Sequence, residues 1–141
     1  MASIAVTTAG SVHVVESLEQ ATLPAAAALL AGDVVYIDAN GRFDKCDADG
    51  AALIAVPYGV ATRSVAIYEP VTAIRRGVMT GWTWSTTAYW TAVLVSDTAG
   101  EITVTSSESN GGSADVALGK VIPIWDHLIG GTPEKALLLT L

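Results

Sequence analysis

The stretch that decides the fold runs from Asp33 to Phe43 and reads Asp33-Val-Val-Tyr-Ile-Asp-Ala-Asn-Gly-Arg-Phe43. Its first half is rich in β-branched and aromatic residues, which favour strands. The pair Asn40-Gly41 follows, and this dipeptide between two apolar runs is the strongest short signal for a β-hairpin. We therefore expect a strand, a tight turn and a second strand.

The same pattern returns in the second half of the chain, from Ala92 to Ile102, with Gly100 in the place of Gly41. A small motif follows each hairpin, Gly59-Val-Ala in the first half and Leu118-Gly119-Lys-Val in the second. The sequence therefore predicts two similar β halves that close on one core, since closure removes exposed strand edges.

Further short runs rich in β-branched and apolar residues predict strands over 11–16, 64–68, 71–74, 121–125 and 136–141. The exception is the Ala- and Leu-rich segment 18–31, where Pro24 suits a first helical turn and Gly32 a stop, so we expect a short helix or an ordered loop there. The expected fold is mainly β, with at most one or two short helices.

A chain of 141 residues suits one domain. We expect a single β domain over 11–141, preceded by an extended N-terminal arm over 1–10.

Charge and hydropathy argue against nucleic acids and membranes as partners. The net charge is −7, and Arg75-Arg76 is the only adjacent basic pair. Binding to phosphates or to an anionic membrane surface needs a basic patch, so we expect neither partner. The longest helix-compatible apolar stretch, Leu23 to Ala31, is too short to span a bilayer. We expect synthesis in the cytoplasm.

The residues that usually perform chemistry lack the spacing that chemistry needs. His13 alternates with valines as in a strand and His127 is expected in a turn, and neither lies in a zinc-binding frame. No Gly-x-Ser-x-Gly motif is present. The acidic run from Asp38 to Asp49 does not fit the EF-hand frame, and acidic neighbours disfavour a reactive thiolate at Cys46. We expect no enzyme, no catalytic residue, no metal and no cofactor.

Three tryptophans, Trp82, Trp84 and Trp90, lie close together in the sequence beside Tyr89. Trp82 and Trp84 have the spacing that points two strand residues to one face. Three interpretations stay open: packing in the core, a subunit interface, for which aromatic residues are enriched, or a platform for stacking sugars.

The N-terminal arm is small, β-branched and uncharged, with no turn residue before Gly10. It either pairs as a first strand within its own domain or adds a strand to an exposed edge of another chain. We take the second as the hypothesis, with the contact to another molecule made by Ser3, Ile4, Ala5, Val6, Thr7 and Thr8. Deleting residues 2–8 should then leave the melting temperature nearly unchanged and weaken binding sharply.

The order of motifs resembles that of small phage head-decoration, or capsid cement, proteins. It runs through Ala31-Gly-Asp-Val-Val-Tyr36, Asn40-Gly41, Gly59-Val-Ala61 and the strand that leads from Val71 to Gly77-Val78. The segments 90–104 and 119–141 are similar to the second half of those proteins, so the resemblance covers roughly residues 30–141.

The resemblance implies a compact β-barrel or β-tulip domain on the outer surface of a mature phage head. It implies a non-enzymatic protein that stabilises the shell, with the major capsid protein as its partner and an arm that reaches onto that protein. A homo-oligomer is expected, with a trimer favoured. The alternative function is a carbohydrate-binding or adhesin-type β module of a virion or cell surface.

Overall fold

The computed structural model describes residues 3–7, 9–49, 54–84, 87–105, 116–129 and 132–141. Its strands are β1 (Ser3–Ile4), β2 (His13–Pro24), β3 (Val34–Ile37), β4 (Phe43–Lys45), β5 (Gly59–Ala61), β6 (Pro70–Thr80), β7 (Ala92–Val95), β8 (Ile102–Thr103), β9 (Ala117–Ile129) and β10 (Thr132–Thr140). One short 3₁₀ turn, Ala9–Ser11, is the only helical element in these ranges. The expected mainly β fold is confirmed.

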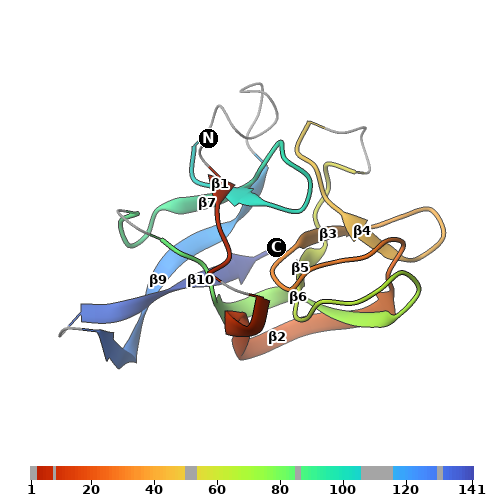
Figure 1. Ribbon diagram of the computed structural model, residues 1–141. Helices are drawn as coiled ribbons and strands as arrows, with labels where there is room; N and C mark the ends of the chain where they lie inside the picture. The colour runs from red at the N-terminus through yellow and green to blue at the C-terminus, as the bar shows by residue number, and fades with distance from the viewer. Residues whose placement is uncertain (1–2, 8, 50–53, 85–86, 106–115, 130–131) are drawn as a thin grey trace.

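All the described strands belong to one antiparallel sheet, which curls into a half-barrel (Figure 1). Its order is β1-β8-β7-β9-β10-β6-β5-β3-β4, and β2 pairs with β6 outside this path. The strand pairing repeats in the two halves of the chain. In the first half β3 pairs with β4 and β5, and β5 pairs with β6. In the second half β7 pairs with β8 and β9, and β9 pairs with β10. The repeat predicted from the two hairpins is therefore present in the strand pairing.

The small motif after each hairpin has the same structural role in both halves. Gly59 on β5 and Gly119 on β9 each lie directly against the main chain of the next strand. A Cβ at either position would clash with a carbonyl oxygen, that of Ile74 for Gly59 and that of Leu138 for Gly119. Glycine is thus needed for close approach of two backbones at both equivalent places.

β5, the beginning of β3 and the part of β6 from Val71 to Ile74 are buried on both faces. Val34, Val60 and Ile74 belong to the main core inside the curled sheet. The residues next to them in sequence belong to a second cluster on the opposite face, which the loops 25–29 and 62–69 cover; it comprises Ala25, Leu29, Val35, Phe43, Ala61, Val65, Val71 and Ala73. This double burial explains why Val34 and Val35 are both apolar although they point to opposite faces.

Main-chain hydrogen bonds join the two hairpins at the ends of the sheet. Ala48 N donates to Ser96 O at 3.0 Å, Gly100 N to Cys46 O at 2.8 Å and Val34 N to Gly100 O at 2.9 Å. The turn between β7 and β8 is thereby held against the segment that follows β4. On this side, loop hydrogen bonds hold the two ends of the curled sheet together.

Three local expectations need correction. Residues 18–24 form neither a helix nor a loop but the second half of β2, because pairing with β6 over its whole length overrides helix propensity. The rest of that segment, residues 25–31, lies in a loop, as one of the two alternatives had it. The run 64–68 is mostly a turn, in which Tyr68 has a φ of 70°, and only Val65 makes a bridge, to Leu29. The turn expected at His127 is instead part of β9.

Candidate interaction surfaces

The N-terminal arm lies on its own domain. β1 pairs with β8, Val6 forms a bridge with Trp82, Thr7 N donates to Gly81 O at 2.8 Å and Thr83 N donates to Ala5 O at 2.9 Å. Residues 3–7 therefore fill an extended slot between β8 and the segment 81–83, which we call the arm slot. Thr8 lies outside the described residues, and contact of the arm with another chain stays a prediction.

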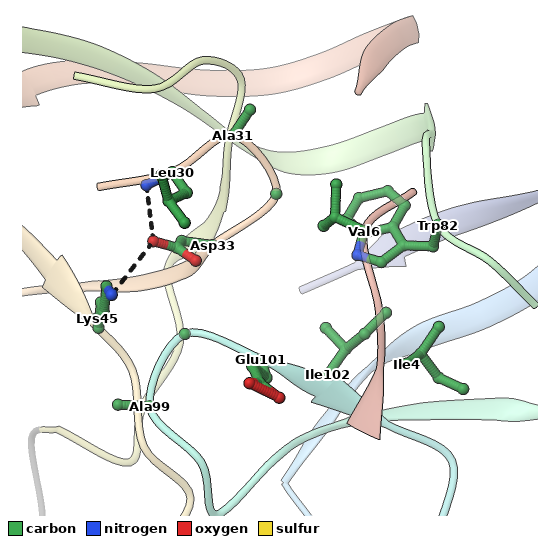
Figure 2. A pocket seen from close by; sticks show the side chains of 12 residues that line it. Ile4, Val6, Leu30, Ala31, Asp33, Lys45, Trp82, Ala99, Glu101 and Ile102 are labelled. Carbon is green, nitrogen blue, oxygen red and sulfur yellow. Dashed lines mark hydrogen bonds and ion pairs between the residues drawn. The ribbon is translucent and has the colours of Figure 1, made fainter. Parts of the chain in front are cut away.

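A cavity of about 310 Å³ opens beside the arm. Figure 2 shows its apolar side, where Val6 lies against the Trp82 ring and Ile4 lies near Ile102. The opposite side is charged and carries Asp33, Lys45 and Glu101. The cavity has both an apolar and an ionic wall.

The Asp33 carboxylate organises the charged wall. It accepts a hydrogen bond from Leu30 N at 2.8 Å and lies 3.9 Å from Lys45 Nζ. Burial raises the pKa of Asp33, while the hydrogen bond from Leu30 and the charge of Lys45 oppose that rise. Because its oxygen closes the turn before β3, Asp33 has a structural role here.

The three tryptophans do not gather in one place. Trp82 and Trp84 are buried in the main core, with ring centroids 6.2 Å apart. The indole nitrogen of Trp84 has no hydrogen-bond partner in the described part of the chain. Of the three, Trp90 alone presents its ring to solvent, with 63% of the residue exposed. Only Trp90 is thus accessible for a subunit or sugar contact in the single chain.

A shallow groove of about 290 Å³ lies beside Trp90. Ala92 of β7 and Ala117 and Gly119 of β9 are small residues that line it, and β10 adds Leu138 and Thr140. The Lys120 ammonium lies 5.2 Å from the centre of the Trp90 ring, within the range of a cation–π contact. The exposed ring of Trp90 lies beside small residues, so a flat ligand can stack on this surface.

The largest unpaired edge in the described residues belongs to β2. This strand has twelve residues and pairs only with β6. Residues 13–20 are all exposed, among them Val14 at 41%, Val15 at 52% and Leu18 at 68%. The register of the β2–β6 pair shifts at Val15 and at Leu18, so these two residues are the extra members of β-bulges, and a third shift leaves Arg75 of β6 as the extra residue.

The sequence did not single out this edge. The sequence pattern predicts a strand over residues 11–16. It does not predict that the strand continues to Pro24 or that one of its edges is free. One signal was available: apolar residues at 12, 14, 15 and 18 are interleaved with Glu16 and Glu19. Charges interrupting an apolar strand are typical of edge strands.

Among the residues considered above as candidates for catalysis or metal binding, Asp38 and Cys46 make hydrogen bonds within the fold. Asp38 Oδ1 accepts hydrogen bonds from Asn40 N and Arg42 N, both at 2.9 Å, and so closes its own turn. The Cys46 thiol is buried and donates to Ile54 O at 3.0 Å, and burial raises its pKa to about 12. His13 lies exposed on β2.

Metal ligands do not gather in the described ranges, where no group of three or more His, Cys, Asp and Glu side chains could hold an ion. The absence of a metal from the complete protein stays a prediction.

Comparison with known proteins gives no match: no family model fits the chain, and no curated protein aligns with it significantly. Within the described residues, no helix has both the length and the apolar character needed to cross a bilayer. The function must therefore be argued from the surfaces described above.

Proposed function

We propose that this chain is a non-enzymatic phage decoration protein that binds the outer surface of the mature head and stabilises the shell. The resemblance over residues 30–141 suggests the partner, the major capsid protein. The observation that carries the proposal is the exposed edge of β2, because it offers a surface suited to binding another protein.

A long unpaired edge with apolar residues favours association with another chain. β2 exposes main-chain donors and acceptors along its free side together with Val14, Val15 and Leu18. In a monomeric protein such an unpaired edge favours aggregation, and native proteins usually cover or shorten it. An extended segment of a capsid subunit that pairs with β2 would satisfy these groups by strand addition.

The charge of the chain suits the outside of the head better than the inside. With a net charge of −7 the protein is repelled by packaged nucleic acid, which is itself densely negative. An outer position avoids that repulsion. The protein would therefore sit on the external face of the shell.

The structure adds a consideration about the arm. The sequence assigned the capsid contact to residues 3–8, and in the single chain residues 3–7 already occupy the arm slot. An arm–capsid contact requires the arm to leave that slot, whereas β2 needs no rearrangement. We therefore place the first capsid contact on β2.

The test is binding of the purified protein to undecorated mature heads, followed by a search for added density at symmetry axes. The double variant V15K/L18K places two charges at the bulges of β2 and should abolish saturation of the heads. The matched control V56K/I67K changes two residues of similar exposure elsewhere, at 61% and 49%, and should bind normally. Unchanged binding of V15K/L18K would remove β2 from the proposal, and failure of the wild type to bind would overturn the function.

A second candidate function rests on Trp90 and its groove. Exposed aromatic rings commonly stack on the apolar faces of sugars, and here the ring stands beside a floor of small residues. A carbohydrate-binding or adhesin-type module would use this surface. Binding to a glycan array that is lost in Trp90→Ala and retained in V15K/L18K would favour this alternative over capsid binding.

A further inference from the structure

The cavity beside the arm has the size and the lining of a site for a small molecule. Its volume of about 310 Å³ falls in the range of ligand pockets, which is about 300–1,000 Å³. Figure 2 shows Val6 and Trp82 on one side of the cavity and Asp33 and Glu101 on the other. Apolar walls that face a few convergent polar groups are typical of pockets that bind an organic ligand in one orientation.

The charges on the polar side of the cavity do not balance. Lys45 Nζ lies 3.9 Å from Asp33 Oδ2, so this ammonium group offsets one carboxylate. The carboxylate of Glu101 has no ion-pair partner in the described part of the chain. Burial is the main cause of the raised pKa of Asp33, and the negative charge of Glu101 adds to it. The cavity therefore holds one uncompensated negative charge opposite an apolar wall.

This charge balance favours a positive group in the cavity. A cation that enters would be attracted by Asp33 and Glu101 and repelled by Lys45 alone. The Lys45 side chain is also the more exposed member of its ion pair, at 38% against 13% for Asp33, and charges in contact with water are screened more strongly. An anion in the same place would be repelled by two carboxylates and attracted by one ammonium group.

The apolar wall comes from the arm and from the core. Ile4 and Val6 belong to the arm, and Trp82 and Ile102 belong to the main core. These side chains offer hydrocarbon contacts on the side opposite to the carboxylates (Figure 2). A ligand that uses both walls must therefore combine an apolar body with a positive group.

We infer that this cavity binds a small organic cation, with its apolar body against Val6 and Trp82 and its ammonium group beside Glu101 and Asp33. The described residues that line the cavity belong neither to β2 nor to the groove beside Trp90. The site is therefore additional to both surfaces proposed above and does not depend on either function.

A ligand in this cavity would also hold the arm on the domain, because it would contact the arm on one side and Glu101, just before β8, on the other. Binding to the docked arm stabilises that arrangement. Thr7 N donates to Gly81 O at 2.8 Å, and hydrogen exchange of this amide should slow when the cavity is occupied. Tyr68 N, which donates to Ala25 O at 2.8 Å outside the cavity, is the control and should exchange at an unchanged rate.

Three probes of similar size test the preference for a cation. Phenethylamine, phenethyl alcohol and phenylpropanoate carry the same ring and, at neutral pH, a positive, a neutral and a negative end group. We expect calorimetry to show that the amine binds about threefold or more tighter than the alcohol and that the carboxylate binds most weakly. Equal affinities for the three probes, or no saturable binding of the amine in the millimolar range, would overturn the inference.

Two variants should change the affinity for phenethylamine in opposite directions. Glu101→Gln removes an attracting charge and should weaken binding about threefold or more, while Lys45→Gln removes a repelling charge and should strengthen binding by a similar factor. Glu69→Gln and Arg76→Gln are the matched controls, because they make the same changes in net charge at exposed positions outside the cavity. Val6→Ala should weaken the amine and the alcohol equally. If Glu101→Gln and Lys45→Gln act in the same direction, or no more strongly than their controls, the cavity does not bind the cation.

Discussion

Gly59 and Gly119 are equivalent residues that hold the two halves of the sheet in the same way, each with its Cα against a carbonyl oxygen of the next strand. No side chain fits between the backbones at either point. The two positions should therefore respond alike to substitution, which makes the internal repeat testable.

Gly59→Ala and Gly119→Ala should each lower the free energy of unfolding by about 2–3 kcal/mol, because the added methyl group forces the paired strands apart. Urea denaturation followed by fluorescence measures this change. Gly10→Ala is the matched control, since a Cβ there meets no atom within 4 Å, and it should be neutral. A large loss at one of the two positions and none at the other would refute their equivalence.

Val6→Ala should lower the free energy of unfolding by about 1 kcal/mol, because the arm packs this side chain against Trp82 and Gly32. The sequence alone predicted that removal of the arm would hardly change the melting temperature; the contacts of Ile4 and Val6 with the core lead us to expect a decrease instead. Ala5→Ser, at an exposed position of the same arm, is the control. Equal melting temperatures for V6A, A5S and the wild type would show that the arm is not bound in solution.

The Cys46 thiol should resist alkylation at pH 8 in the folded protein and react readily in urea, because burial raises its pKa from 9.0 to about 12. The same shift predicts a pH dependence of stability. Above pH 9 the unfolded chain loses the thiol proton while the folded chain keeps it, so the free energy of unfolding should fall between pH 9 and about 12. Cys46→Ala should lack this contribution; an identical alkaline decline in both proteins would contradict the assignment.

Trp82→Ala should destabilise the fold by about 3–5 kcal/mol, as expected for the loss of a large buried side chain. Trp90→Ala should change stability by less than about 0.5 kcal/mol, because its ring is exposed. Thermal unfolding separates the two cases. If Trp90→Ala destabilises the isolated chain as much as Trp82→Ala does, then Trp90 is a core residue, and both roles considered for its surface lose their basis.

The hairpins were predictable because their signals are local. Asn40-Gly41 and the turn before Gly100 specify their conformation through neighbouring residues alone, and both are found where expected. The strand at 18–24 was missed because its conformation depends on β6, some fifty residues away, whose pairing no local propensity records. Likewise, the burial of Trp82 and the exposure of Trp90 depend on where residues distant in sequence pack, and the spacing of the tryptophans does not predict this.

The bulges at Val15 and Leu18 have a consequence for self-association through the free edge of β2. A regular free edge of twelve residues could pair with the same edge of other copies of the chain, and such pairing leads to aggregation. Three register shifts in the β2–β6 ladder, two with the extra residue on β2 and one with it on β6, break the even spacing of donors and acceptors on which indiscriminate strand addition depends. The bulges in β2 therefore disfavour the regular stacking of copies that fibre growth requires, and an extended segment that pairs with this edge needs a matching irregularity.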